Sequence, residues 1–560
     1  MTDCRNEVIS NDYLDLISED YRRFENILTD VCRQQITENL YIVYLDRKMH
    51  PPLSLSTYSY KVIPNCYGLI DKSALESSGI LKVIDQPSLN LTGKGVIIGI
   101  IDTGIDYRNK LFINSDNTTK IESIWDQTIQ TGRPPEGFIY GSEYSSFDIN
   151  EALNSDNPLD IVPSTDEIGH GTYVAGLAAG NISVENDFQG AAYDATLAIV
   201  KLKPAKPYLR EFFLINDEAD CYQENDIIAG VKYLDELARN LNKPLVICLA
   251  LGTSMGNHSG TSPLCKYLNQ VGRYSSNAIV TGTGNEANTR HHYYGSIQSE
   301  NEYDDIEIRV GKNNRGFITE LWSESVNILT ISIISPSGEE VPRIPARLGQ
   351  NDLFGFIFEN TKISVNYDLI ESGSGKELIL LRFMAPTEGI WTIRVYSSGI
   401  HGTFHMWLPI ESFLFSDVYF LESDPDVTLT EPSTASGVIT TGAYNHRTNS
   451  ISIISGRGFT LSEVIKPDIV APGVDIEGPT GRRFGTVTGS SAAVAITSGA
   501  VAQFMEWAVV KGNDPIIDSV KIKNYLILGA DRKNNITYPN TEWGYGSLNL
   551  FGTFKSLIIR

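Results

Sequence analysis

The sequence has no paired-cysteine motif, no surplus of basic residues and no apolar run long enough to cross a bilayer. Its six cysteines are scattered without CxxC spacing, which argues against a zinc site or a disulfide framework and predicts free, mostly buried thiols. The 45 Lys and Arg against 68 Asp and Glu give a net charge of −23, so we expect no binding to nucleic acid or anionic membranes. The longest apolar runs, such as GVIIGII, have only the length of a strand.

The amino terminus, MTDCRNEVISNDYLDL, is polar and acidic. It lacks the basic segment followed by an apolar core that marks a signal peptide. The 560 residues and a hydrophobic fraction of 41% are ordinary for globular proteins. This length predicts roughly three or four domains.

Residues 1–86 predict a small α/β unit. DYLDLISED, LYIVYLD and part of YKVIPNCYGLI indicate strands, while YRRFENILTDVCRQQ has the apolar spacing of a helix. A short helix over DKSALESSG and a final strand over ILKVID complete a β-α-β-β-α-β order. That order is typical of a ferredoxin-like fold.

The remainder alternates between two kinds of pattern. Residues 87–294 and 427–560 contain continuous apolar strands with helices between them, which predicts a parallel sheet covered by helices on both faces. Residues 295–426 instead contain short strands separated by turns such as SPSGEE and SSGIHG. This segment is predicted to be an all-β insertion of the sandwich or jelly-roll type.

A glycine and two serines open the most apolar helix of the chain. The stretch VTGSSAAVAITSGAVA places Gly489, Ser490 and Ser491 directly before a long run of Ala, Val and Ile. One interpretation is a helix cap, since serine satisfies free backbone N–H groups there. The other is a nucleophile beside N–H groups that could stabilise an oxyanion. This stretch alone does not decide between them.

Three further polar residues follow strands or open helices of the predicted sheet. Asp102 ends the apolar run in VIIGIIDTGIDY and is favoured over Asp106, which lies farther from the strand. His170 opens the helix of IGHGTYVAGLAAG, and Asn285 follows a strand in AIVTGTGNEAN. Catalytic groups of open α/β sheets gather at such strand ends. Each residue alone has a structural explanation. Together with Ser491, however, the three supply a nucleophile, a base, an orienting carboxylate and an oxyanion donor.

The segments IIDTGID, GHGTYVAG, TGTGNEAN, KPDIVAPG, TGSSAAVA and WGYGSLN resemble signature segments of the subtilisin-like serine proteases. The resemblance covers about residues 94–294 and 427–551. It implies that Asp102 orients, His170 is the base, Ser491 is the nucleophile and Asn285 is the oxyanion donor. It also implies that Ala250, Leu251 and Gly252 form a wall of the substrate channel.

Two other serines resemble the nucleophile motif superficially. Ser254 lies in LGTSMG, but no long apolar helix follows it and it precedes Asn285. Ser262 is predicted to cap the helix that begins at PLCKYLNQV. The chain also departs from the family pattern: Tyr173 stands where a second His is common, Ala495 where a proline is common, and Ala250 where a serine is common. Ala250 leaves the specificity pocket undetermined.

A narrower resemblance is to the clostridial Csp germination proteases. It rests on PNCYGLID, SALESSGI and NLTGKGVIIGIIDTGIDY, together with the amino-terminal α/β unit and the β insertion between the Asn and Ser motifs. The resemblance implies a self-processing zymogen whose cleaved prodomain stays bound, a jelly-roll insertion and a location in the spore. It further implies limited proteolysis of a cortex-lytic pro-enzyme.

One alternative function and the question of a cofactor remain open at this stage. The alternative to a protease is a catalytically silent member of the same fold that signals or binds during germination. Many relatives bind calcium, but the sequence has no dense Asp cluster with ligand spacing, so no metal or other cofactor is predicted. The cut in the prodomain is predicted between Val83 and Asn90, since ILKVIDQ is expected to enter the channel as an extended strand.

Overall fold

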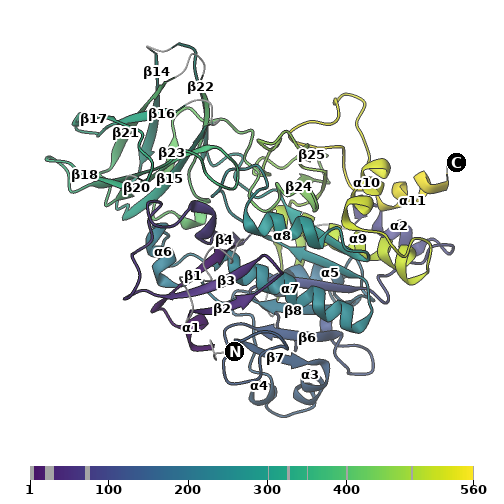
Figure 1. Ribbon diagram of the computed structural model, residues 1–560. Coiled ribbons are helices and arrows are strands. Elements are labelled where there is room, and N and C mark those ends of the chain that lie inside the picture. Colours follow the sequence, from purple (N-terminus) through teal and green to yellow (C-terminus); the bar gives the residue numbers. More distant parts are fainter. Residues whose placement is uncertain are drawn as a thin grey trace.

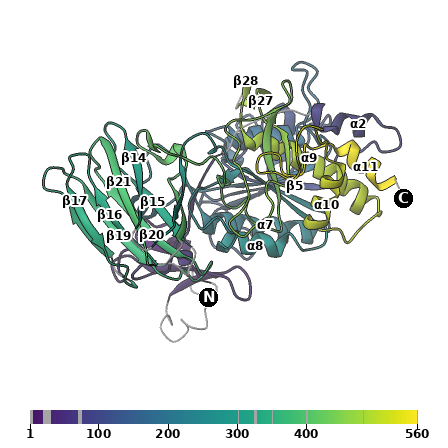
Figure 2. The ribbon, with the colours of Figure 1, turned by 90° about the horizontal axis from the view of Figure 1, so that it is seen from above.

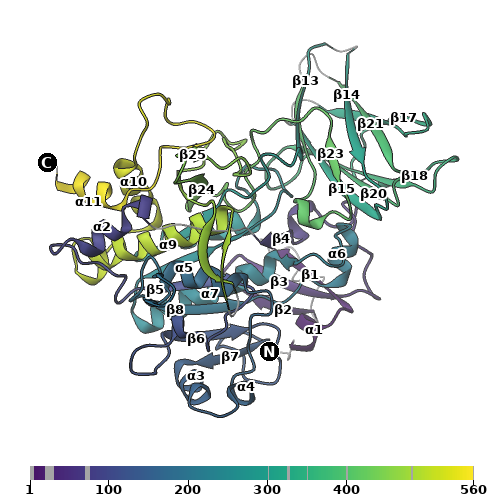
Figure 3. The same cartoon turned by 180° about the vertical axis from the view of Figure 1, so that it is seen from behind.

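The computed structural model describes residues 5–18, 31–69, 76–299, 302–323, 328–349, 351–398, 402–480 and 483–558. The fold is a subtilisin-like α/β sheet with two smaller parts beside it, as Figure 1 shows. The amino-terminal part and the β insertion lie on the same side of the central sheet, and the carboxyl-terminal helices lie on the other (Figures 1 and 3).

The central sheet has the strand order β25-β24-β12-β10-β5-β8-β6-β7, with β26 paired to β24. Most pairs are parallel, and only β6–β7 and β24–β25 are antiparallel. Its strands are β5 (Ile97–Asp102), β6 (Ile121–Asp126), β7 (Ser142–Ser145), β8 (Thr196–Lys201), β10 (Leu245–Leu249), β12 (Asn277–Gly282), β24 (Ile439–Asn445), β25 (Ser450–Ile451) and β26 (Ile469–Pro472).

Helices cover both faces of this sheet, as predicted. Side chains alternate along each strand, so Ile98 and Ile100 belong to one hydrophobic core and Ile97 and Ile101 to the other. The helices of this part are α3 (Ser146–Leu153), α4 (Pro158–Ile161), α5 (His170–Ala179), α6 (Pro207–Phe212), α7 (Glu224–Leu241), α8 (Pro263–Val271), α9 (Ser490–Met505), α10 (Ser519–Gly529) and α11 (Leu550–Ile558).

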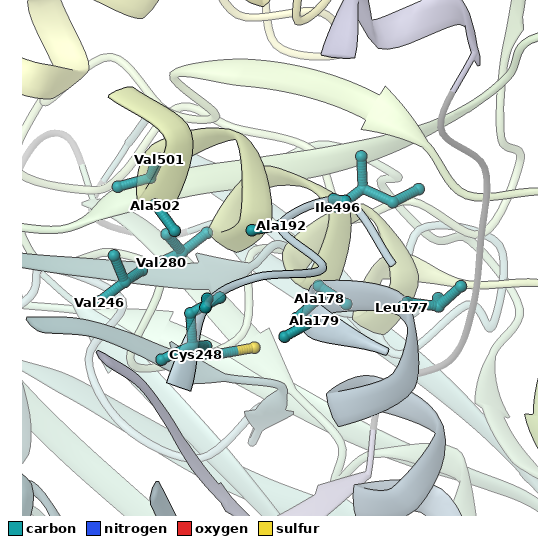
Figure 4. Close-up of a cluster of buried hydrophobic side chains, with 14 of the residues drawn as sticks. Leu177, Ala178, Ala179, Ala192, Val246, Cys248, Val280, Ile496, Val501 and Ala502 are labelled. Carbon is teal, nitrogen blue, oxygen red and sulfur yellow. The ribbon is translucent and has the colours of Figure 1, made fainter. Parts of the chain in front are cut away.

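Helix α9 lies at the centre of the hydrophobic core that contains Ile98 and Ile100, here called the first core. Figure 4 shows Ile496, Val501 and Ala502 of α9 beside Val280 of the sheet and Leu177 of α5. The helical stretch Ser490–Val510 has the length and composition of a membrane span, but 83% of it is buried inside the protein, as in a core helix. Where α9 passes into the π-helical turn Glu506–Val510, the Glu506 carboxylate accepts hydrogen bonds from the backbone N–H groups of Thr92, Gly93 and Lys94.

The amino-terminal part differs from its prediction. Three of its strands form a sheet in the order β1-β3-β2, but ILKVID is a helix rather than a final strand. Of the helix predicted over YRRFENILTDVCRQQ, only the last residues are described, and Cys32–Gln35 is a strand. The elements are α1 (Arg5–Ile9), β1 (Tyr13–Ser18), β2 (Cys32–Gln35), β3 (Tyr41–Asp46), η2 (Tyr60–Val62), β4 (Cys66–Leu69), η3 (Glu76–Ser78) and α2 (Ile80–Asp85).

The cysteines also depart partly from expectation. Cys66, Cys221, Cys248 and Cys265 are free and buried, as predicted. Cys32 is disulfide-bonded, so the prediction of free thiols is wrong at this position. The chain therefore carries a disulfide in its amino-terminal part without any CxxC motif.

The insertion consists of two stacked antiparallel sheets, visible from above in Figure 2. Their orders are β13-β22-β15-β20-β19-β18 and β17-β16-β21-β14-β23, and Phe317, Phe383 and Trp391 belong to the core between them. The strands are β13 (His292–Ile297), β14 (Tyr303–Val310), β15 (Gly316–Ser323), β16 (Leu329–Ile334), β17 (Glu340–Ile344), β18 (Asn351–Gly355), β19 (Lys362–Asp368), β20 (Glu377–Met384), β21 (Gly389–Ser397), β22 (Gly402–Trp407) and β23 (Val418–Phe420).

The remaining elements are short strands, a hairpin and short helical turns. Strands β9 and β11 contain two residues each, and β27 and β28 form a hairpin before α9. These elements are η4 (Lys110–Phe112), β9 (Tyr222–Gln223), β11 (Leu251–Gly252), η5 (Glu411–Phe413), β27 (Ile476–Thr480), β28 (Arg483–Val487) and η6 (Glu506–Val510).

Candidate active site

Asp102 is the last residue of the central strand β5. All six residues of the strand are buried, and the Asp102 side chain is fully excluded from solvent. The backbone N–H of Thr103 donates to Asp102 Oδ1 at 2.7 Å. A buried carboxylate needs such donors to remain charged, and Asp102 gains a second one from helix α5.

That second donor is His170, the first residue of α5. Its Nδ1 lies 2.8 Å from Asp102 Oδ1, and its Nε2 lies 3.0 Å from Ser491 Oγ. With Nδ1–H donating to the carboxylate, Nε2 accepts from the serine hydroxyl. The first turn of α5 lies against the loop that follows β5. Only glycine fits at position 171, where a Cβ would lie 2.2 Å from the carbonyl oxygen of Gly104.

Ser491 lies in the first turn of α9 and is fully buried. The residue before the helix is Gly489, whose φ of 154° and ψ of −178° fall in a region that only glycine adopts readily. Gly489, the N-cap residue, has no side chain with which to cap the helix. The Ser491 hydroxyl instead bonds His170, so the geometry favours the nucleophile interpretation over the cap.

Asn285 lies beside the same helix start. It follows β12, which neighbours β10 in the sheet, and its Oδ1 accepts a hydrogen bond from the Ser490 N–H at 3.0 Å. Because that bond fixes the amide by its oxygen, the Asn285 NH₂ group remains as a donor. The structure thus brings Asp102, His170, Ser491 and Asn285 together at one edge of the sheet.

Asp166 is a site residue that sequence reasoning missed. Its Oδ1 accepts from Thr103 Oγ1 and from the Gly169 N–H, both at 2.8 Å. Its Oδ2 accepts from the N–H and the hydroxyl of Thr172 at 2.8 and 2.6 Å. One carboxylate therefore ties the loop after Asp102 to the first turn of the His170 helix. Its position four residues before His170 was the available signal.

The predicted channel wall is paired with a strand from the chain itself. Strand β4 lies between β11 and β9 in a three-stranded sheet. Leu251 pairs with Leu69 and Gly252 with Gly68, in antiparallel register, while Ala250 is the buried residue between β10 and β11. YKVIPNCYGLI was predicted to contain a strand, but its partners were expected in the amino-terminal unit. They belong to the catalytic part instead.

The residues set aside by sequence reasoning have other partners. Asp106 Oδ1 accepts from Arg108 Nε at 2.8 Å. Ser262 caps α8 by accepting from the Cys265 N–H at 3.2 Å, as predicted, and the Ser254 carbonyl oxygen lies 3.1 Å from His258 Nε2. Tyr173 extends away from the site, and its hydroxyl donates to the Ile476 carbonyl.

Metal-ligand clustering does not occur in the part of the chain that the structure describes. Within those residues, no group of three or more His, Cys, Asp or Glu side chains could hold a metal ion.

Comparison with known proteins places these features in a family. The sequence profile of the subtilase family matches residues 93–340 and 419–546, more than half of the chain. The solved CspB protease of Clostridium perfringens is 32% identical, with a TM-score of 0.77, covering 86% of this chain and 98% of that one.

Two curated relatives match over shorter stretches. A subtilisin of Bacillus sp. (strain TA39) is 26% identical over 279 residues, which cover 49% of this chain and 53% of the subtilisin. The subtilisin-like protease SBT3.6 of Arabidopsis thaliana is 27% identical over 174 residues, 29% of this chain and 21% of that protein. The chain thus spans about half or less of these two relatives. By its profile match and its similarity to the CspB structure, it belongs to the subtilase family, the subtilisin-like serine endopeptidases.

Proposed function

We propose that this chain is a serine endopeptidase that acts through Asp102, His170 and Ser491. The observation that carries the proposal is the continuous line of hydrogen bonds from Asp102 Oδ1 through His170 to Ser491 Oγ. A serine hydroxyl is a weak nucleophile at neutral pH, and a base with a fixed tautomer makes it effective. The buried Asp102 carboxylate, accepting from Nδ1–H, leaves Nε2 free to take the proton.

The reaction follows from this geometry in two halves. Ser491 Oγ attacks the substrate carbonyl carbon while His170 Nε2 accepts the hydroxyl proton, and His170 then gives that proton to the leaving amine. The oxygen that gains negative charge would lie near the Asn285 NH₂ group and the free N–H groups of the α9 amino end. Water attacks the resulting acyl-enzyme with His170 again as base, which restores Ser491.

A second part of the proposal is that the enzyme cleaves its own prodomain. Strand β4 is held between β9 and β11 by antiparallel backbone pairing, the way an extended peptide substrate is held by a protease. Helix α2 (Ile80–Asp85) includes the start of the segment from Val83 to Asn90, which would have to be extended for a cut there. We therefore move the proposed cut to the residues directly after β4, within 70–75.

The prodomain is proposed to stay bound after the cut. Its side chains Ile17, Ile42 and Tyr44 belong to the same hydrophobic core as Ile227 and Val231 of α7. Separation would expose these apolar surfaces to water, at roughly 25 cal/mol for each Å².

Polar contacts reinforce the same interface. The Lys206 ammonium of the catalytic part lies 2.5 Å from Asp15 Oδ1 of β1, and both side chains are buried. On the insertion side, Tyr60 donates to Glu320 Oε1 at 2.6 Å and packs edge-on against Trp322. The prodomain thus contacts both other parts of the chain.

The substrate class is a protein or peptide, and the particular substrate is a further proposal. Similarity to the CspB protease, with the sequence resemblance to the Csp germination proteases, supports a cortex-lytic pro-enzyme as substrate and the spore as location. Limited cleavage of such a zymogen by the purified protein, and no cleavage by Ser491→Ala, is the expected result. A zymogen left intact by an enzyme that hydrolyses other peptides would reject this substrate alone.

A fluorophosphonate probe tests the central proposal. A working site reacts covalently at Ser491, whereas a catalytically silent member of the fold does not react. Intact mass spectrometry and amino-terminal sequencing of the wild type test processing: we expect two chains in one complex and a new amino terminus within 70–76. Ser491→Ala should remain a single chain. A wild type that is also uncut would reject self-processing.

A further inference from the structure

Strand β4, which we call the channel strand because it pairs with the predicted channel wall, brings two cysteines together across the boundary between prodomain and catalytic part. Cys66 is the first residue of β4, and Cys221 directly precedes β9. Cys66 pairs with Gln223 in antiparallel register. Residues two apart on a strand share a face, so Cys221 lies on the same face as Gln223 and is the diagonal neighbour of Cys66.

The two thiols are in contact inside the protein. Cys66 is fully buried and Cys221 is 1% exposed, and both belong to the hydrophobic core that joins all three parts of the chain. The Cys66 thiol interacts with that of Cys221, so the two are near enough for a disulfide to close when β4 shifts. The Cys221 carbonyl is fixed by the Ala205 N–H at 2.7 Å.

We propose that Cys66 and Cys221 form a reversible disulfide that holds the prodomain strand covalently in the substrate channel. The pairing itself needs only the contact between the two thiols. Its effect on activity rests on the proposed function, in which β4 occupies the channel after self-cleavage. Oxidation would then keep the enzyme inhibited, and reduction would permit β4 to leave the channel while the rest of the prodomain stays bound.

The chemistry balances with a low-molecular-weight disulfide, RS–SR, as oxidant. The Cys66 thiolate attacks one sulfur of RS–SR, forms a Cys66–SR mixed disulfide and releases RS⁻. The Cys221 thiolate then attacks Cys66 Sγ, closes the Cys66–Cys221 bond and releases the second RS⁻. Two protein thiols and one RS–SR become one protein disulfide and two RSH.

The buried position of the two thiols favours a slow reaction that requires β4 to move away from its neighbouring strands. Burial raises the pKa of the Cys66 thiol, with the hydrogen bond to Cys221 adding to the effect. Because the thiolate is the reactive form, both oxidation and reduction should proceed when β4 transiently leaves its two neighbouring strands. Redox state is thereby linked to prodomain docking.

The other cysteines are suited to serve as controls. Cys248 lies in β10 within the first core, and Cys265 donates to Glu431 Oε2 at 2.6 Å. Cys32 is already disulfide-bonded. The Ser491→Ala protein keeps the prodomain uncut, so it reports the pairing without depending on catalysis.

Peptide mapping of full-length Ser491→Ala tests the disulfide. The protein is equilibrated in glutathione buffers of rising oxidised fraction, approached from reduced and oxidised starting samples, alkylated and digested with trypsin. We expect a linked pair of peptides, 62–72 with 211–232, and its absence in Cys66→Ser and Cys221→Ser. If both thiols remain alkylated in the most oxidising buffer from both starting samples, the proposal is wrong.

Activity of the wild type tests the consequence. Peptide hydrolysis should fall roughly 100-fold on oxidation, because a tethered strand rebinds at high effective concentration, and it should return on reduction. Cys221→Ser should lose this response and Cys248→Ser should keep it. A mapped disulfide without any change in hydrolysis would overturn the inhibitory role. A wild type with no hydrolysis in any buffer would reject the proposed function and leave the mapped pairing standing.

Discussion

The catalytic cluster and the channel strand are held by opposite means. At the cluster, side chains position one another: Asp102 orients His170, His170 contacts Ser491, and Asp166 fixes the turn that carries the histidine. Along the channel, β4 is held through backbone pairing with β9 and β11. Side-chain geometry depends on single residues, whereas backbone pairing tolerates many sequences. Substitutions should therefore affect the cluster sharply and the channel strand mildly, except where a buried charge is left unpaired.

The largest expected effect is that of Ser491→Ala. Loss of the nucleophile should lower peptide turnover by about 10⁶-fold, the size of the effect in subtilisin itself, with no change in the folded structure. Steady-state kinetics and circular dichroism measure the two. Ser490→Ala is the matched control and should retain substantial activity, because its hydroxyl has no hydrogen-bond partner among the residues that the structure describes. The reverse pattern would show that the nucleophile is misassigned.

The next effect is that of Asn285→Ala on the chemical step. Removing one oxyanion donor should lower kcat by about 10²–10³-fold. KM should change little, since the interaction strengthens in the transition state. An unchanged kcat would remove Asn285 from the mechanism and leave the backbone N–H groups of α9 as the donors.

Lys206→Met tests the exception along the prodomain interface. It leaves the Asp15 carboxylate buried without its cation, which costs about 3–5 kcal/mol in comparable pairs. Native mass spectrometry should show a prodomain that dissociates far more readily than in the wild type. The double variant Asp15→Leu/Lys206→Met should recover much of the binding, because neither charge of this pair is then left buried without its partner. If the single variant binds as tightly as wild type, the ion pair does not contribute to retention.

Asp166→Asn should have a smaller effect on the cluster. The substitution turns one of the two accepting oxygens into an NH₂ group, which cannot accept from the donors that face it, so the His170 turn should be held less firmly. A misplacement of that kind can lower kcat by up to about 100-fold, with KM nearly unchanged. The rate of fluorophosphonate labelling at Ser491 should fall in parallel, which a general loss of stability would not produce at temperatures well below unfolding.

The smallest effect concerns pH and the insertion. His292 Nε2 lies 2.9 Å from His405 Nδ1, and burial lowers the pKa of His292 to about 4 and that of His405 to about 2. The unfolded chain therefore binds more protons than the folded one below about pH 6.5, so stability falls as pH drops from there toward 4. We expect a loss of about 2 kcal/mol for each histidine by pH 5, measured by thermal unfolding. His405→Gln should weaken this dependence, and an equal slope in both proteins would contradict it.

The sequence predicted four residues of the cluster, but neither Asp166 nor the pairing of the channel strand β4. Asp102, His170 and Asn285 each sit at a strand end or a helix start, where local pattern alone places them on the edge of the sheet. The helix over ILKVID could not be told from a strand, because Ile80, Val83 and Ile84 fit helical spacing and a short apolar run fits both. The partners of β4 lie more than 150 residues away along the chain, and no local signal specifies such pairing.

The position of α2 would make the self-cleavage irreversible. Helix α2 lies beside α11 at the edge of the molecule, well apart from β4 (Figures 1 and 3), and its Ile80 and Val83 are fully buried there. After a cut within 70–75, the new carboxyl end belongs to the channel strand and the new amino end to the segment that leads to α2. The new amino group, held away from the acyl-enzyme, competes poorly with water as a nucleophile. Re-ligation of the two chains would therefore be suppressed, and the cut would be irreversible.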